Sequence, residues 1–167
     1  TDDGATNGGA ARINYTSSSF TVDSGFENHP VGWVSWFGAT AFCNYYGYRL
    51  PTEWEWQAVA DFNGSYIYGC GTTITNSIAN YYNSSHPDGT TAVGSVGNPS
   101  GYGYGMCDMA GNVWEWTSSC YNSDCSNGFR ILRGGGWNES DNSCTVSRWH
   151  NYNPGNMSIQ DGFRVCR

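Results

Sequence analysis

The segment from residue 64 to residue 112 shows no persistent helical or strand period, and this limits the folds that the chain can adopt. Gly, Asn, Ser and Pro interrupt it every few residues. Such a long irregular segment is uncommon in a compact domain, unless metal ions, disulfides or aromatic packing hold it in place. Aromatic residues make up 16% of the 167 positions, so large side chains are available for this task. We therefore expect one loop-rich domain over residues 1–167.

The charged residues exclude several classes of function. The chain has seven basic residues, all of them arginine, and a formal net charge of −7. A nucleic acid or an anionic membrane would need a basic face, so neither is expected as a partner. The absence of lysine excludes Schiff-base chemistry and a P-loop lysine. No signal peptide or bilayer-spanning stretch is visible, so we expect no membrane insertion, and an exported protein would have lost its leader before Thr1.

Seven cysteines are a high number for a chain of this length. No tight CxxC pair and no cluster of cysteine with histidine is present, as a zinc site would require. Disulfides formed in an oxidising compartment are the better interpretation, and they predict an extracellular protein or one displayed on a cell or virion. Cys120 and Cys125 are close enough in sequence to close a small loop. Because seven is odd, at least one thiol stays free or pairs with another chain.

Local patterns predict two helices and several short strands. Ser35 can cap a helix over Trp36–Tyr46, which Gly47 would end. Thr52 and Glu55 match a capping box that begins a second helix. Strand patterns occur at Ile13–Tyr15, Phe20–Val22, Val113–Thr117, Arg130–Arg133 and Phe163–Arg167. The expected fold class is α+β, with two helices, short strands and much irregular loop.

Several phrases occur in a fixed order along the chain. They are His29–Val31, Val34–Trp36, Ala41–Cys43, Gly47–Trp56, Tyr104–Thr117, Leu132–Trp137 and Gly162–Arg164. In this order the phrases resemble the formylglycine-generating-enzyme family, a variant of the C-type lectin fold. The resemblance covers residues 29–167 and implies a C-type-lectin-like fold of that subtype. Charged residues in these phrases, such as Arg49, Glu53 and Arg164, must be paired if they are buried.

The resemblance does not extend to the catalytic residues of that family's oxidase. The oxidase uses a reactive, copper-binding cysteine pair shortly after its Gly-Gly-Ser-Trp/Tyr phrase. The matching segment here, Trp137–Ser143, contains no cysteine, and Cys144 aligns better with a structural half-cystine. A related iron-binding branch uses clustered histidines, whereas His29, His86 and His150 are far apart in sequence. Since a thiolate is needed to bind copper or to act as a nucleophile, we expect no enzyme activity.

The C-terminal part also resembles the variable proteins of diversity-generating retroelements. Those proteins carry a Gly-Gly-Ser-Trp phrase, a cysteine, an Asn-rich stretch around a proline and a closing Gly-Phe-Arg. The matching phrases here are Arg133–Trp137, Asn142–Cys144, Asn151–Pro154 and Gly162–Val165. In that family, mutation of adenines in the gene diversifies the protein, and the resemblance places such a variable ligand-binding region at residues 133–164.

Within this region, residues 149–161 show no helical or strand period and mix aromatic, polar, apolar and acidic types. On a rigid scaffold, such a mixture is typical of an antibody-like binding surface, and an ordinary surface loop is the alternative. The candidate ligand-binding residues are Gly136, Asn138, Trp149, His150, Asn151, Tyr152, Asn153, Gly155, Asn156, Met157, Ser158, Ile159 and Asp161. Some of their aromatic members can remain exposed, because the core is already supplied by Trp36, Trp54, Trp56, Trp114 and Trp116.

The resemblance further implies structural calcium and one disulfide. Residues matching one calcium site are Asn80, Tyr81 and Asp88. Residues matching a second, through the Glu115 side chain and three backbone carbonyls, are Ala110, Gly111, Val113 and Glu115. Oxygen-only ligands suit Ca²⁺, but a turn with a buried, hydrogen-bonded glutamate is an equal alternative. The family also bridges positions near Cys43 and Cys166, with Cys166 one residue later than the family pattern.

The leading hypothesis is therefore a binding protein for adhesion or receptor recognition. Its ligand would be an unknown protein or surface group, and the chain is expected to be a monomer. Two alternatives stay open: a metal-dependent oxidase of the formylglycine-generating-enzyme family, and a non-variable structural member of the fold.

Overall fold

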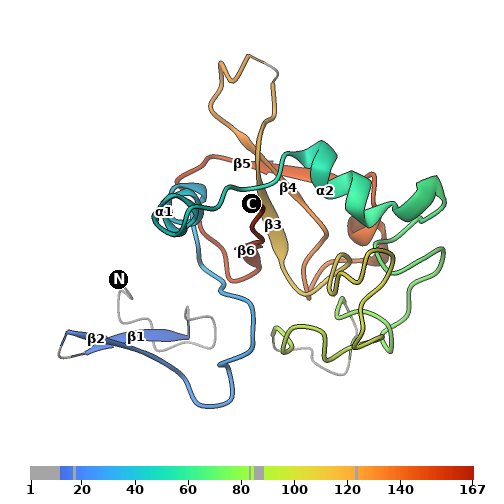
Figure 1. Ribbon diagram of the computed structural model, residues 1–167, viewed down its shortest axis with the longest axis horizontal. Helices are drawn as coiled ribbons and strands as arrows, with labels where there is room; N and C mark the ends of the chain where they lie inside the picture. Colours follow the sequence, from blue (N-terminus) through green and yellow to red (C-terminus); the bar gives the residue numbers. More distant parts are fainter. Residues whose placement is uncertain (1–11, 17, 83, 85–88, 123) are drawn as a thin grey trace.

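The computed structural model describes residues 12–16, 18–82, 84, 89–122 and 124–167 (Figure 1). Within them the chain forms a two-stranded hairpin, two α-helices and a four-stranded sheet, joined by long loops. The hairpin consists of β1 (Ile13–Thr16) and β2 (Ser19–Val22), which pair antiparallel as predicted. The fold class is α+β. In this described part, neither α-helix has the length and apolarity needed to cross a bilayer.

Both predicted helices are present with their caps. Helix α1 (Trp36–Tyr46) begins where the Ser35 hydroxyl accepts a hydrogen bond from the Gly38 amide at 3.1 Å, and it ends at the left-handed Gly47. Helix α2 (Glu53–Ala60) begins at Thr52, where both hydrogen bonds of a capping box are formed. These side chains satisfy amide groups that the first turn of a helix leaves without partners, which explains why both starts could be predicted.

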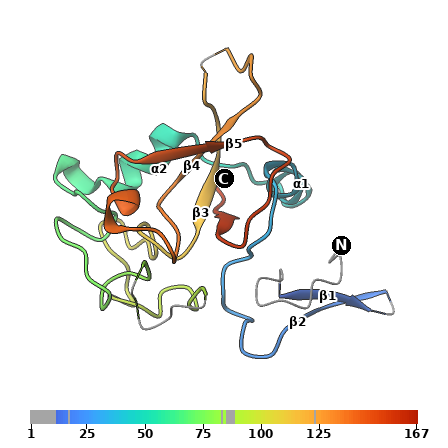
Figure 2. The same ribbon diagram turned by 180° about the vertical axis from the view of Figure 1, so that it is seen from behind.

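The main sheet has four strands in the order β5–β4–β3–β6. Strand β3 (Trp114–Cys120) pairs antiparallel with β4 (Arg130–Arg133) and parallel with β6 (Asp161–Phe163). Strand β5 (Trp149–Tyr152) lies antiparallel to β4 at one edge. Figures 1 and 2 show α1 and α2 on opposite sides of this sheet.

Two expectations about the C-terminal third are wrong. Residues 149–161 were not expected to contain a strand, yet β5 forms because its backbone pairs with β4, from Trp149 opposite Arg133 to Tyr152 opposite Arg130. The predicted strand Phe163–Arg167 is displaced, since β6 ends at Phe163 and Cys166 forms only an isolated bridge with Arg49. Non-local backbone pairing decides both outcomes, and no local side-chain period reveals it.

Core side chains pack around both helices. One cluster joins Ala39 and Cys43 of α1 to Trp114 and Trp116 of β3, and another joins Trp56 of α2 to Met109 and Val146. A third cluster lies under the long loops and contains Ala79, Ala110 and Cys144.

Trp54 is the exception among the tryptophans expected to form the core. It is 67% exposed, whereas Trp56 is buried and Trp36 packs against the first cluster from its edge. Residues two positions apart lie on different sides of a helix, so α2 can bury only one of the pair.

Buried amides hold part of the long irregular segment in place. The Asn112 side chain accepts a hydrogen bond from the Thr91 amide at 3.0 Å and donates one to the Thr91 carbonyl at 3.1 Å. The Asn112 amide donates to the Asn80 carbonyl at 2.7 Å. Gly111 has a φ of 77°, and a Cβ atom there would lie 2.3 Å from the Asn80 carbonyl oxygen, so only glycine fits. These contacts fix the start of β3, which carries the central charged pair described below.

Candidate ligand-binding site

Strand β5 presents two different faces, because successive side chains of a strand point to opposite sides. Trp149 is 41% exposed, and its ring centre lies 5.3 Å from that of the exposed Tyr121. The rings of His150 and Tyr152 lie 4.6 Å apart, and the His150 ring lies 5.8 Å from that of the buried Trp114. Tyr152 also packs against the α1 core cluster. Trp149 is thus available to a ligand, whereas His150 and Tyr152 are half-buried beside the core.

The turn that follows β5 is held through its backbone. The Trp36 amide donates a hydrogen bond to the Pro154 carbonyl at 3.1 Å, and the Trp33 amide donates to the Ser158 carbonyl at 2.9 Å. The side chains of this turn that remain exposed are Asn153, Asn156 and Met157. A substitution at Asn156 or Met157 changes the surface while these backbone bonds remain. Asn153 also helps to hold the turn, because its Oδ1 accepts a hydrogen bond from the Gly155 amide at 3.0 Å.

The candidate ligand-binding residues divide by exposure into three groups. The exposed residues are Asn138, Trp149, Asn153, Gly155, Asn156 and Met157. The half-buried residues are His150, Asn151, Tyr152, Ser158 and Ile159. The buried residues are Gly136 and Asp161. We use the term recognition surface for the exposed residues of β5 and its turn, which are Trp149, Asn153, Gly155, Asn156 and Met157.

Gly136 was predicted to contact a ligand. This prediction is wrong, because the residue is buried in the loop that follows β4. A Cβ atom at this position would lie 2.8 Å from Oε1 of Gln160 and 3.4 Å from Cδ1 of Trp114. A larger residue at this position would require the Gln160 side chain to shift.

Asp161 is also wrong as a ligand contact, since it is 0% exposed. It is the first residue of β6 and pairs with Trp114, and within the described residues neither of its carboxylate oxygens accepts a hydrogen bond. Burial raises the pKa of Asp161 to about 7, because the charged form loses its hydration and gains no counter-charge. The side chain is a buried acid and not a surface group.

Glu115 lies at the centre of a buried ion pair. Its carboxylate accepts hydrogen bonds from Arg164, with both distances 2.5 Å, and from the indole nitrogen of Trp56 at 2.6 Å. Burial alone would lower the pKa of Arg164, but the Glu115 carboxylate reverses this and raises it. Both oxygens of Glu115 are already engaged, so the hydrogen-bonded alternative fits this residue better than a role as a calcium ligand.

The other predicted calcium ligands have different surroundings in the structure. The Asn80 amide oxygen accepts a hydrogen bond from the Ser84 hydroxyl at 2.7 Å, and Asp88 lies outside the described residues. Tyr81 is half-buried, which raises the pKa of its phenol. Ala110, Gly111 and Val113 are buried, and the Gly111 amide donates to the Gly134 carbonyl at 2.8 Å. Over the described ranges, no three or more His, Cys, Asp or Glu side chains gather where they could hold a metal ion. A calcium site around Asn80 therefore stays a prediction.

One predicted disulfide is formed and the other is not. Cys120 and Cys125 are bonded, with a Cα–Cα distance of 5.2 Å, and they close the loop between β3 and β4. Cys43 and Cys166 are free thiols. Cys166 stands one residue later than in the pattern that suggested the bond, although it still lies near enough to help raise the pKa of Cys43 after burial.

Cys43, Cys70 and Cys144 are not activated for chemistry. Burial raises the pKa of Cys144 to about 12 and that of Cys70 to about 11. A cavity of about 420 Å³ between α1 and α2 is lined by Cys43, Thr40 and the Arg49–Glu55 ion pair, among others. Burial also raises the pKa of Cys43. These thiols are protonated at neutral pH and offer no thiolate to a metal or a substrate.

Sequence reasoning missed three exposed aromatic residues that lie next to the candidate segment. Tyr121 contacts Trp149. Trp33 donates its backbone amide to the turn, and Phe37 follows Trp36, which does the same. Both side chains are exposed. The only local signal is their aromatic character. Their position depends on the pairing of β5 with β4 and on the docking of the turn, which join segments far apart in sequence.

Residues 7–167 match the sulfatase-modifying factor enzyme 1-like domain. The chain therefore belongs to this family. It is 33% identical over 173 residues to serine/threonine-protein kinase pkn1 of Chlamydia pneumoniae, covering 94% of this chain and 27% of that relative. It is 38% identical over 117 residues to the inactive C-alpha-formylglycine-generating enzyme 2 of Bos taurus, covering 65% of this chain and 38% of the relative. The chain thus spans a minor part of both relatives.

Solved structures show the same fold. Treponema denticola variable protein 1 superposes with a TM-score of 0.72 at 24% identity, over 83% of this chain and 70% of that protein. The Major Tropism Determinant M1 variant gives a TM-score of 0.54 at 20% identity, over 79% of this chain and 37% of that protein. At these identities the similarity shows the fold alone, which is the predicted C-type-lectin-like fold.

Proposed function

We propose that this chain is a ligand-binding protein without enzyme activity, whose region 133–164 is diversified by a retroelement. The observation that carries the proposal is the separation of roles around β5. Backbone hydrogen bonds from β4, Trp33 and Trp36 fix the path of the segment, while the side chains of the recognition surface face solvent. A rigid backbone with exposed, exchangeable side chains is what a diversified binding surface needs.

The chemistry of the cysteines supports the proposal against a metal-dependent oxidase. No cysteine occurs in Trp137–Ser143, and Cys144 is buried with a pKa raised to about 12. A copper-binding or nucleophilic thiolate would require the opposite environment, with partial exposure and a lowered pKa.

The expected ligand is a protein or another surface group, recognised by direct contact with Trp149 and its neighbours. Rigid aromatic side chains lose little conformational entropy on binding and often dominate interface energetics. The exposed Cys120–Cys125 bond agrees with an oxidising compartment, so we extend the proposal to an extracellular or surface-displayed location.

A saturation library tests whether the recognition surface can vary without loss of the fold. Trp149, Asn156 and Met157 would be randomised one at a time, displayed on yeast and sorted for resistance to protease. We expect these positions to accept most residue types, whereas the buried controls Leu132 and Gly111 should accept few. If the three positions prove as restricted as Leu132, the segment is structural and the proposal fails.

The gene provides an independent test that separates a variable protein from a non-variable member of the fold. The proposal expects a near-copy of the codons for residues 133–164 beside a reverse-transcriptase gene. It also expects differences between copies to fall at adenine positions. A locus without either feature would favour the structural alternative.

A further inference from the structure

Two of the free thiols, Cys70 and Cys144, lie on segments that the backbone holds together. Tyr68 forms an antiparallel bridge with Thr145 and a second one with Gly71, where the chain turns back on itself. Cys144 directly precedes Thr145, and Cys70 directly precedes Gly71. Each cysteine is thus next in sequence to a residue that bridges Tyr68, which brings the two cysteines to the same place in the fold.

The side chains of the two cysteines share one core cluster. Cys144 is 0% exposed and belongs to the cluster under the long loops, and Cys70 packs against that cluster from its edge. After burial, the nearby Cys70 is the next cause that raises the pKa of Cys144. The Cys70 thiol donates a long hydrogen bond of 3.9 Å to the Thr73 carbonyl. Because a thiol is a weak donor, the sulfur can leave this contact at little cost.

We propose that Cys70 and Cys144 form a second disulfide, which ties the long irregular segment to the connection between β4 and β5. The inference rests on the oxidising, extracellular or surface-displayed location that is part of the proposed function. A disulfide joins Cα atoms that lie about 4.4–6.8 Å apart. Segments held by antiparallel bridges bring Cα atoms to about 4.5–5.5 Å, so the backbone around Tyr68 has the spacing that such a bond needs.

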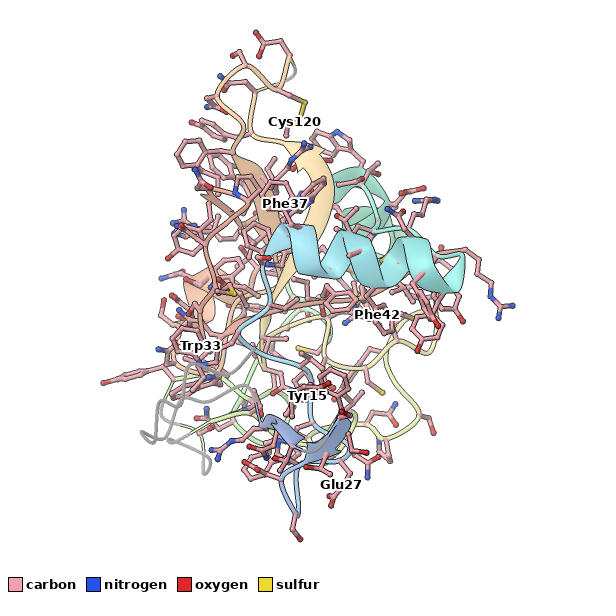
Figure 3. The ribbon with its side chains drawn as sticks, turned by 90° about the vertical axis from the view of Figure 1, so that its left-hand side faces the viewer. Tyr15, Glu27, Trp33, Phe37, Phe42 and Cys120 are labelled. Atoms are coloured by element: carbon pink, nitrogen blue, oxygen red, sulfur yellow. A yellow bond between two sulfur atoms is a disulfide. The ribbon has the colours of Figure 1, made fainter. Side chains whose placement is uncertain are left out.

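The bond would hold a part of the molecule that the existing disulfide does not reach. Cys120–Cys125 closes the loop that projects from the sheet between β3 and β4 (Figure 3). Cys144 ends the 3-10 helix η2 (Asp141–Cys144) within region 133–164, whereas Cys70 lies in the irregular segment 64–112. A bond between them would anchor the base of the region proposed to vary to a constant part of the chain. It would also supply the kind of cross-link that a long irregular segment needs.

The state of the thiols indicates that the bond forms while the chain folds. In the folded, reduced protein, burial raises the pKa of Cys70 to about 11 and that of Cys144 to about 12, so both thiols are protonated at neutral pH. In an unfolded chain the pKa of cysteine is about 8.5, and a larger fraction is reactive thiolate. Once the bond has formed, the burial of Cys144 shields it from reductants.

Oxidised glutathione, itself a disulfide, can serve as the oxidant. One cysteine thiolate attacks a sulfur of oxidised glutathione, forms a mixed disulfide and expels one glutathione thiolate. The second cysteine thiolate attacks the protein sulfur of the mixed disulfide and expels the other. The protein loses two S–H bonds and gains one S–S bond, and its two electrons and two protons leave as two reduced glutathione molecules.

Peptide mapping after refolding tests the proposal. The reduced, unfolded chain would be refolded with oxidised and reduced glutathione, alkylated to cap free thiols, and cut before each aspartate. This cleavage places every cysteine on a peptide of its own, with Cys70 on residues 61–87 and Cys144 on residues 141–160. We expect mass spectrometry to find these two peptides joined by a disulfide. A link from either cysteine to another peptide, or capped thiols at both, would overturn the proposal.

The known bond is the internal control, since Cys120 and Cys125 fall on the peptides 108–123 and 124–140. If this link forms and the link between Cys70 and Cys144 does not, the inference is wrong while the proposed location keeps its support. If neither link forms, the inference and the proposed location both fail.

Thermal denaturation shows whether the bond holds the fold. Reduction of the refolded wild type should lower its melting temperature by at least about 5 °C, because the bond closes a long loop. Cys70→Ser should lose most of this dependence on reductant, even if the serine itself lowers the melting temperature. Cys107→Ser is the matched control, because Cys107 is also a half-buried free thiol, and it should keep the dependence. Equal dependence in the two variants would contradict the proposal.

Discussion

Two buried carboxylates on neighbouring strands have opposite surroundings. Glu115 of β3 accepts hydrogen bonds from Arg164 and Trp56, so its charge is fully compensated. Asp161 of β6 is equally inaccessible to water, yet no hydrogen bond from the described part of the chain reaches either of its carboxylate oxygens. Glu115 is thus adapted to hold a charge in the interior, whereas Asp161 is protonated below about pH 7.

The difference separates a charged group that belongs to a network from an acid that stands alone. Glu115 joins β3 to α2 through Trp56 and to the C-terminal strand region through Arg164, so each partner depends on the others. Within the described residues, the Asp161 side chain makes no hydrogen bond that would have to change with it. A substitution there breaks no hydrogen-bond network, although burial still restricts the size of the side chain.

Removal of Arg164 should have the largest effect, because it leaves the Glu115 charge buried and unpaired. We expect Arg164→Ala to lower the free energy of unfolding by about 3–5 kcal/mol, measured by urea denaturation. Arg49→Ala is the control, since the Arg49–Glu55 pair is exposed and should contribute little. Equal effects of the two substitutions would contradict the central role of the buried pair.

The pH dependence of stability should report Asp161. Its pKa is about 7 in the folded protein and near the ordinary value of 3.8 in the unfolded chain. Between these values the folded protein holds a proton that the unfolded chain has lost. The free energy of unfolding should therefore fall as pH rises from about 4 to about 7, by about 4 kcal/mol in total, and then level off.

Asp161→Asn isolates this contribution, because asparagine does not titrate. Urea denaturation of both proteins across this pH range should show a difference that grows with pH in favour of the variant. Wild-type and variant curves that run parallel would mean that Asp161 finds a partner in solution.

Substitution of Tyr152 should have a smaller effect on stability, and it tests where the fixed scaffold ends. Its ring packs against the α1 core cluster, although it belongs to the segment proposed to vary. We expect Tyr152→Ala to lower the free energy of unfolding by about 2–3 kcal/mol, within the range for truncation of a partly buried aromatic ring. Thermal and urea denaturation would measure it, and a loss close to zero would place Tyr152 on the recognition surface instead.

The parts of the fold that depend on local chemistry could be predicted from the sequence. Ser35 and Thr52 mark the helix starts through side chains that bond amides within three residues, and the ordered family phrases gave the fold class. Strand β5, the Glu115–Arg164 pair and the exposure of Trp54 rather than Trp56 could not be assigned in this way. Each depends on which distant segment lies opposite. For the same reason Gly136 and Asp161 were expected at the surface although they are buried, and Tyr121, which contacts Trp149, was missed. The position of the binding segment itself stays a prediction.

The smallest expected change concerns Trp149, and it tests the other side of the comparison. Trp149 contacts Tyr121 at the surface, and its backbone, not its ring, pairs with β4. Trp149→Ala should therefore lower the free energy of unfolding by less than about 1 kcal/mol, as is usual for surface positions. Its loss should be clearly smaller than that of Tyr152→Ala, although the two residues lie on one strand and both remove an aromatic ring. If Trp149→Ala is the more damaging substitution, its ring is part of the scaffold. The recognition surface would then lose its main aromatic anchor, and the binding proposal would have to rest on Met157 and the asparagines of the turn.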